Sequence, residues 1–198
     1  MSFLLPDVFL IDGENLVARF QAMKAVGRVP KSTVIHVPDV LVWTPELIGD
    51  AVGDIRRVSY YTTVVGDDDR VAAIEKQIRG FAYSCRDATI KRQQQVVPRV
   101  FKKAAKSNKS RSVDINIVID ALRYARGSAI GIVTLFSGDG DFASLAKELT
   151  HAGVQVHVSA LSSGASPLLE SCADAFAILD DKFFEPVRPN QGVAVGVA

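Results

Sequence analysis

The sequence predicts an α/β fold whose central sheet is mostly parallel. Short runs rich in β-branched and aromatic residues alternate along the chain with segments whose apolar residues recur at helical spacing. This alternation is typical of right-handed strand–helix–strand crossovers, which produce parallel strands. In addition, two of the apolar runs end directly in acidic turns, and that end of a strand is where open α/β sheets bind ligands.

The expected elements follow from these patterns in chain order. Strands are predicted at residues 8–12, 57–65, 88–97, 130–136, 154–160 and 175–179, the last at an edge of the sheet. Helices are predicted at residues 15–25, 67–81, from 112 onward, 142–151 and 167–172. Thr44 and Pro45 predict a further helix start, as the N-cap and the first helical residue.

Two irregular segments and one helix face are predicted as follows. Residues 27–42 contain two prolines and no clear period, which predicts an irregular excursion. Residues 102–111 are basic and poor in large apolar groups, which predicts a mobile loop. In the helix that begins at residue 112, the predicted buried stripe consists of Ile115, Val118, Ile119, Leu122 and Ala125.

Length and composition favour a single domain of an intracellular type. The 198 residues suit one domain over residues 1–185, followed by a tail at 186–198 that is expected to be disordered. The longest apolar runs are far shorter than a membrane span, so no membrane partner is expected. The two cysteines are too few for a disulfide framework or a thiolate metal site. These features predict a reduced, cytoplasmic setting.

The small net charge of +1 hides a strong segregation of charge. Eight of the 23 Lys and Arg residues lie between Asp87 and Asp114 with no acid among them, which leaves 15 against 22 acids, or −7, for the rest. Such a local positive field suits a polyanionic partner. The eight residues are Lys91, Arg92, Arg99, Lys102, Lys103, Lys106, Lys109 and Arg111.

Acidic side chains follow two predicted strands at the point where each strand ends. Asp12 follows the apolar run 8–11, and Asp139 and Asp141 follow the run 129–136. Asp114 lies in the first turn of a predicted helix. Each acid also has an ordinary structural explanation, because Asp–Gly sequences form turns and acids stabilise helix N-termini. Taken together, however, the acids favour a shared site.

A cluster of this kind would need a cation. Two carboxylates about 4 Å apart repel each other by roughly 4 kcal/mol at an effective dielectric near 20. Three or four such groups would take up protons or separate unless a cation lay between them. Because the set offers only oxygen ligands, it predicts Mg²⁺ or Mn²⁺ and a metal-dependent hydrolase of phosphodiesters.

Other polar residues are weaker candidates. Asp120 lies six residues after Asp114 and points about 120° away on the helix, so we expect it behind the site or on the surface. Asn15 either caps the following helix or holds Asp12 or a phosphate through its amide. The three histidines are scattered outside these motifs and are expected to be ordinary solvent or helix-end residues.

The chain resembles the NYN domain, a branch of the PIN-like nuclease superfamily, and within it the LabA-like group. The motifs are Ile11–Asn15, Arg111–Asp114 at a helix start and Ser137–Phe142, in this order. The segments 153–158 and 168–176 also resemble the usual ending of the LabA-like group. The resemblance extends from about residue 6 to residue 181. One departure is Arg111-Ser112, where the family commonly has Lys, often followed by Gly.

This resemblance implies a Rossmann-like, PIN-like three-layer sandwich and a metal-dependent ribonuclease, which we expect to act endonucleolytically. By position, the catalytic and metal-binding acids would be Asp12, Asp114, Asp139 and Asp141. Asn15, Ser137 and Asp120 would support them. Related domains often pair, so a homodimer is one expected assembly.

The basic segment is interpreted as the RNA-binding surface, with a solvated loop as the alternative. Phe101 is its only aromatic residue, so we expect contacts to the RNA backbone rather than base stacking. The residues assigned to RNA are Lys91, Arg92, Lys102, Lys103, Lys106, Lys109 and Arg111.

Two other classes of protein share some of these features. One is a non-catalytic RNA-binding or regulatory module that keeps the acidic pocket. The intact set of four carboxylates argues against it. The other is a phosphatase of the haloacid dehalogenase type, which needs a second Asp two positions after its nucleophile. Here that position is Glu14, which disfavours this class.

Overall fold

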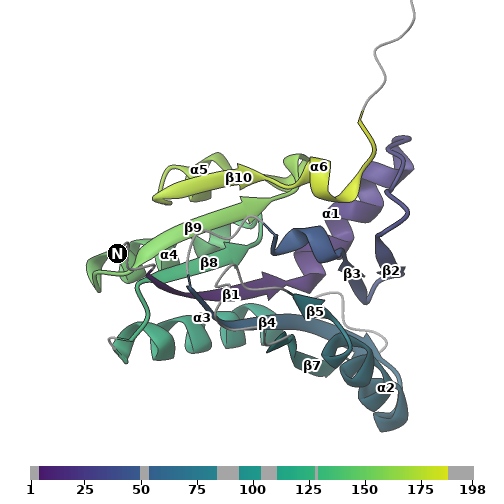
Figure 1. The fold of residues 1–198 in the computed structure, drawn as a ribbon, viewed down its shortest axis with the longest axis horizontal. Helices are drawn as coiled ribbons and strands as arrows, with labels where there is room; N and C mark the ends of the chain where they lie inside the picture. Colours follow the sequence, from purple (N-terminus) through teal and green to yellow (C-terminus); the bar gives the residue numbers. More distant parts are fainter. Residues whose placement is uncertain (1–4, 50–53, 84–93, 104–110, 128, 187–198) are drawn as a thin grey trace, which may run out of the picture.

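The computed structural model of the protein describes residues 5–49, 54–83, 94–103, 111–127 and 129–186. A six-stranded parallel sheet forms its centre, with the strand order β10-β9-β8-β1-β4-β7 from top to bottom in Figure 1. The strands are β1 (Pro6–Asp12), β4 (Asp54–Val65), β7 (Val97–Lys103), β8 (Ile132–Phe136), β9 (Gln155–Ala160) and β10 (Ala175–Ile178). The predicted α/β fold with a mostly parallel sheet is therefore confirmed.

Helices cover both faces of this sheet and give three layers. One face packs against α1 (Gly13–Ala25), α2 (Asp68–Arg79), α6 (Asp180–Phe183) and the hairpin of β2 (Ile35–Val37) and β3 (Leu41–Trp43). The other face packs against α3 (Arg111–Arg126), α4 (Ala143–His151) and α5 (Pro167–Glu170). Short elements complete the fold: β5 (Ala82–Tyr83), β6 (Gln94–Gln95) and the 3₁₀ turns η1 (Pro45–Leu47), η2 (Gly140–Phe142) and η3 (Ser162–Gly164).

The chain changes direction across the sheet between β1 and β8. From β1 it proceeds through β4 to β7 on one side, and α3 then carries it back to β8, β9 and β10 on the other. The carboxyl ends of β1 and β8 are neighbours, because Ile11 pairs with Phe136. Such a switch point leaves a crevice at the carboxyl edge of a parallel sheet, where ligands of this fold class bind.

The sequence predictions were wrong in the region before α3. The strand that joins the main sheet is β7, where residues 97–103 pair with β4, rather than the predicted segment 88–97. Lys102 and Lys103 therefore belong to an edge strand and not to a mobile loop. Residues 88–93 and 104–110 lie outside the described part of the chain.

The predicted buried stripe of α3 was also partly wrong. Ile115 and Ile119 are 53% and 38% exposed, whereas Val113, Ile117 and Ala121 are buried against the sheet. The other three predicted residues, Val118, Leu122 and Ala125, are partly buried against the same core.

The segment 27–42 is more ordered than predicted. Val42 in β3 exchanges two hydrogen bonds with Tyr60 of β4, at 3.0 Å from Val42 N to the phenol and 3.1 Å from the phenol to Val42 O. These bonds dock the β2–β3 hairpin onto the sheet. The Thr44 cap before Pro45 was predicted correctly, although it begins a 3₁₀ turn.

No helix in the described ranges combines the length and apolar character that a membrane crossing requires. The predicted tail at 186–198 falls almost wholly outside the described residues.

Asp7 is a buried acid at the amino end of β1, far from the carboxyl edge. Its two oxygens accept a shared hydrogen bond from Thr134 Oγ1 of β8, at 3.1 and 2.9 Å. Burial raises the pKa of Asp7 from its ordinary 3.8 to about 7, while the Thr134 hydrogen bond opposes the rise. The folded protein therefore holds the Asp7 proton more tightly than the unfolded chain does.

We expect Asp7→Asn to gain stability over the wild type as the pH rises from about 4 to about 7. The contribution of protonated Asp7 is complete below the unfolded pKa and is lost as the pH rises to the folded pKa. At about 1.4 kcal/mol per pKa unit, the gain is at most roughly 4 kcal/mol. Urea unfolding at several pH values measures it. Exposed Asp69→Asn is the control, and parallel curves for wild type and Asp7→Asn would refute the prediction.

Candidate functional site

Asp12 is the residue on which the candidate site is built. It is the last residue of β1 and the N-cap of α1, and only 2% of its surface is exposed. Its Oδ1 accepts a hydrogen bond from the Asn15 backbone N–H (3.0 Å), and its Oδ2 accepts one from Ser137 Oγ (2.8 Å). Both carboxylate oxygens are thereby fixed in direction.

The turn after Asp12 requires glycine at position 13. A Cβ there would lie 2.4 Å from Cε1 of Tyr60 and 2.6 Å from the carbonyl oxygen of Tyr61. These are closer than any real Cβ contact, so the backbone of α1 can approach β4 only without a side chain. The Asp-Gly sequence therefore sets where the first turn of α1 lies against the sheet.

Ser137 joins the ends of the two central strands. Its hydroxyl donates to Asp12 Oδ2 and also accepts a hydrogen bond from the Asp139 backbone N–H (3.2 Å). Asp139 in turn accepts the Asp141 N–H at its Oδ1 (3.0 Å) and caps η2. Asp12 and the turn that carries Asp139 and Asp141 are thus connected through one buried hydroxyl.

Asn15 has a different role from those predicted. Asp12, and not Asn15, caps α1, and Asn15 contacts Asp12 through its backbone N–H. The Asn15 side-chain oxygen accepts the Gly138 N–H (3.1 Å). The amide therefore ties α1 to the turn after β8, which adds a second link, beside the Ser137 hydroxyl, between the two segments.

The electrostatics of Asp12 show which other acids lie near it. The pKa of Asp12 is raised from its ordinary 3.8 to about 7, mainly by burial and to a smaller extent by the charges of Asp114 and Glu14. The hydrogen bonds from Asn15 and Ser137 act in the opposite direction. The structure thus brings Asp114, on the first turn of α3, into electrostatic reach of Asp12.

Glu14 is a site residue that the sequence analysis did not assign. It accepts a hydrogen bond from Thr63 Oγ1 of β4 and lies 3.9 Å from the ammonium of Lys103. The available signal was its place two residues after Asp12 in the same motif. We call Asp12, Glu14, Asp114 and Asp139 the acidic cluster.

The donor chemistry of the acidic cluster fits a hard divalent cation. All its donors are carboxylate oxygens, and mutual repulsion contributes to the raised pKa of Asp12, which a cation would reverse. Within the described ranges, no three His, Cys, Asp or Glu side chains are arranged closely enough to hold a metal as they stand.

Two further predicted site residues differ from Asp12 in their burial or their partners. Asp141 is exposed, and its backbone N–H provides its contact with Asp139. Asp120 is buried rather than on the surface: it accepts a hydrogen bond from the Tyr61 phenol (2.9 Å) and pairs with Arg99 (3.0 Å) and Arg123 (3.4 Å). Because Tyr61 is the register partner of Asp12, this network braces the strand beside the site.

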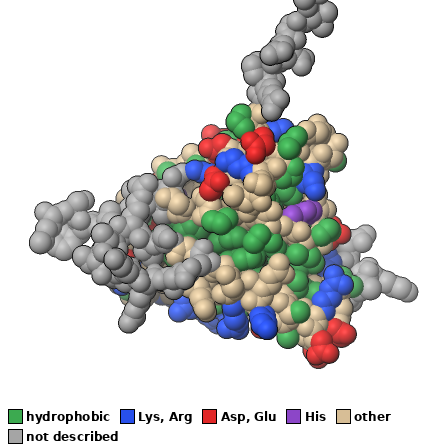
Figure 2. Space-filling model, turned by 45° about the vertical axis from the view of Figure 1, so that its right-hand side comes forward, with side chains coloured by type: hydrophobic (Ala, Val, Ile, Leu, Met, Phe, Trp, Pro, Cys, Tyr) green, Lys and Arg blue, Asp and Glu red, His purple; other side chains and the backbone are tan. Residues whose placement is uncertain are grey.

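The edge strand β7 divides its basic residues between two faces. Successive strand residues point to opposite sides. Lys103 therefore extends toward Glu14, whereas Lys102 pairs with Asp68 of α2 (2.8 Å). On the face in Figure 2, basic side chains lie along the lower border, with acidic ones at its right-hand end. Basic and acidic side chains also occupy the top, and an apolar area lies between. Lys91, Arg92, Lys106, Lys109 and the side chain of Arg111 lie outside what the structure describes.

The fold and site define an α/β domain with a buried acid at a topological switch point, within electrostatic reach of two other carboxylates. A family model, the NYN domain, matches residues 8–180. The chain therefore belongs to the NYN domain family, whose members are generally nucleases of the PIN-like superfamily.

A solved structure of a protein of unknown function from Vibrio parahaemolyticus is similar in fold. It superposes with a TM-score of 0.62 at 18% sequence identity, covering 93% of this chain and 99% of the other. At that identity the likeness supports the three-layer architecture alone. No curated protein matched the sequence.

We expect Ser137→Ala to destabilise the fold by about 1–3 kcal/mol, because it leaves both Asp12 Oδ2 and the Asp139 N–H without their partner. Urea unfolding at neutral pH measures the change. Ser171→Ala is the matched control, since that exposed hydroxyl donates to the carbonyl of Leu168 and otherwise lies 3.9 Å from the neighbouring Cys172 Sγ, at the surface and away from Asp12. Equal stability of Ser137→Ala and wild type would contradict the bridging role.

Proposed function

We propose that this protein is a metal-dependent ribonuclease that cleaves RNA endonucleolytically. The observation that carries the proposal is the buried Asp12 carboxylate at the switch point, linked by Ser137 to Asp139 and within electrostatic reach of Asp114. NYN family membership supports a nuclease, and NYN nucleases typically act on RNA. The motifs at residues 153–158 and 168–176 support the LabA-like group.

In this proposal Asp12, Asp114, Asp139 and Asp141 hold Mg²⁺ or Mn²⁺. When bound, the metal would supply activation of water for attack on phosphorus and stabilisation of the leaving oxygen. Glu14, whose charge acts on Asp12, is a further candidate ligand.

The chain's own residues prepare this site by orientation. Ser137 and the Asn15 N–H fix the two oxygens of Asp12, so little reorganisation is needed when charge develops beside it. Gly13 and Gly138 allow backbone segments to approach closely behind these groups, which limits the space for water there. Asp120 acts indirectly, since it holds Tyr61 and Arg99 next to the strand that carries Asp12.

Lys103 is the described basic residue best placed to bind substrate. Its ammonium lies 3.9 Å from Glu14, so it faces the acidic cluster, and a phosphate could replace this weak pairing. Lys102 is exposed and held by the almost fully exposed Asp68, which makes it a weaker candidate. The assignment of the remaining basic segment to RNA, the cytoplasmic setting and a homodimer stay predictions from the sequence.

We expect Asp139→Asn to lower Mn²⁺-dependent cleavage of RNA by about two orders of magnitude or more, as when one group that stabilises a transition state is removed. The fold should persist, because an Asn oxygen can still accept the Asp141 N–H. Asp181→Asn, an exposed acid on α6, is the control. Cleavage assays with purified metals and thermal melting provide the two measurements.

The outcomes separate the proposal from its rival. Undiminished cleavage by Asp139→Asn would contradict the assigned site. A wild type that binds RNA in Mn²⁺ without cutting it would instead support the non-catalytic RNA-binding module.

A further inference from the structure

Arg19 lies on α1 one turn after Asn15. Residues four apart share a helix face, and long side chains lean toward the helix N-terminus. Because α1 begins immediately after Asp12, this direction is that of the acidic cluster. The sequence motifs did not include Arg19.

Arg19 is in close contact with the backbone of η3. A Cβ on Gly164 would lie 2.2 Å from Arg19 Nε and 2.4 Å from its Cδ, so the arginine stem covers this glycine directly. The carbonyl oxygen of Gly164 would likewise lie 2.1 Å from a Cβ on Gly138. The Gly138 N–H donates to the Asn15 side chain. A series of direct contacts therefore connects Arg19, through Gly164 and Gly138, to Asn15 at the candidate site.

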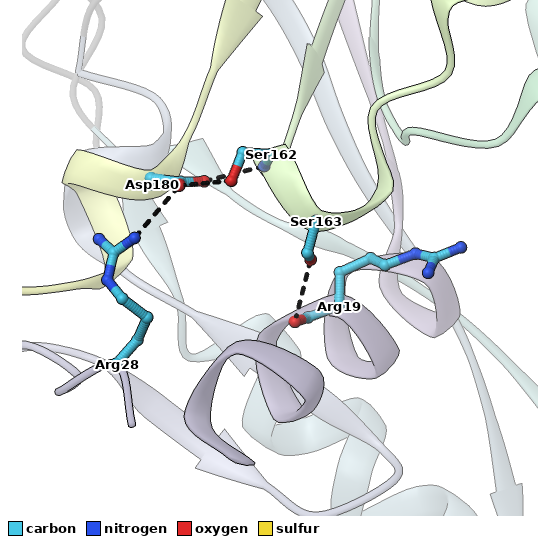
Figure 3. A network of polar contacts seen from close by, with 5 residues as sticks. All are labelled: Arg19, Arg28, Ser162, Ser163 and Asp180. Atoms are coloured by element: carbon cyan, nitrogen blue, oxygen red, sulfur yellow. Dashed lines mark hydrogen bonds and ion pairs between the residues drawn. The ribbon is translucent and has the colours of Figure 1, made fainter. Parts of the chain in front are cut away.

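The surface beneath Arg19 is held rigidly. Ser163 Oγ donates to the Arg19 carbonyl (3.4 Å), and Ser162 donates to Asp180 through both its N–H (2.9 Å) and its hydroxyl (2.6 Å). Asp180 also pairs with Arg28 (3.4 Å). Figure 3 shows that the Arg19 guanidinium points away from this network, so Asp180 is engaged by Arg28 and not by Arg19.

The charge of Arg19 is available to a ligand. The residue is exposed, and none of the ion pairs formed among the described residues includes it. An arginine on a fixed surface offers a planar set of donors that matches a phosphate in a two-point contact. Arg28, by contrast, already forms an ion pair with Asp180.

Arg19 and Lys103 lie on opposite sides of the acidic cluster. Lys103 ends β7, beyond β4, whereas Arg19 covers η3, which follows β9 on the other side of β1 and β8. We propose that Arg19 binds a backbone phosphate of the RNA strand, so that the strand crosses the carboxyl edge of the sheet between Lys103 and Arg19. This inference rests on the proposed ribonuclease function.

The test is RNA binding by the full chain without divalent metal, so that cleavage cannot occur. A fluorescent single-stranded RNA is titrated by anisotropy at several salt concentrations. Arg19→Met keeps a stem that can cover Gly164 but removes the charge, and should raise Kd about five- to tenfold at low salt. The slope of log Kd against log salt should fall by about 0.7, the value for one lost phosphate contact. Arg19→Lys should keep most of the slope.

Two further variants exclude a purely structural role. Arg126→Met removes an exposed cation from the far end of α3, about 18 Å along the helix from Asp114. It should leave Kd for RNA and the slope of log Kd against log salt unchanged. Gly164→Ala should displace the Arg19 side chain and weaken binding in the wild type. In the Arg19→Met background the same change should have little further effect.

The results distinguish failure of this inference from failure of the proposed function. If wild type binds and cuts RNA but Arg19→Met has the same Kd and salt slope, the Arg19 contact is refuted and the ribonuclease stands. If wild type shows no salt-dependent binding to RNA, both are overturned.

Discussion

A buried carboxylate at the carboxyl end of β1 is the constraint on which this structure depends. Asp12 occupies a buried position where an apolar residue would cost less free energy of folding. Burying a charge away from water is unfavourable unless hydrogen bonds compensate it. The compensation comes from Ser137, which follows β8, and from the backbone of Asn15. The parallel pairing of β1 with β8 is what brings these groups together. The strand pairing that forms the sheet therefore also positions the groups of the candidate site.

Close backbone packing extends this arrangement to the surface. Gly13 lets α1 lie against β4, and Gly138 lets the turn after β8 lie against η3. Each contact leaves no room for a side chain, so the position of one segment fixes that of the next. A polar side chain on α1 can in this way be held at a set place relative to acids that are far away in sequence.

The positions of the basic side chains around the site also depend on the sheet, because strand alternation decides the face to which each one points. The alternation along β7 sends Arg99 and Lys103 to the face that carries α3 and the acidic cluster, and Lys102 to the face that carries α2. A basic stretch that looks uniform in the sequence is thus divided into one cation paired with the buried carboxylate of Asp120, one in a surface pair and one that faces the acids. Their different partners give the three cations different roles.

The sequence by itself determined the strand–helix alternation, the two acidic turns and the tight Asp-Gly junction, because each is encoded in a few adjacent residues. It did not determine which face of α3 is buried: Ile115 and Ile119 are as apolar as Ile117, and the choice was made by the sheet against which the helix packs. It also misplaced β7, since an edge strand is selected by its partner β4 rather than by local composition. The bridge made by Ser137, the contacts of Glu14 with Thr63 and Lys103, and the place of Arg19 were decided only by the tertiary structure, because each joins segments that are far apart in the chain.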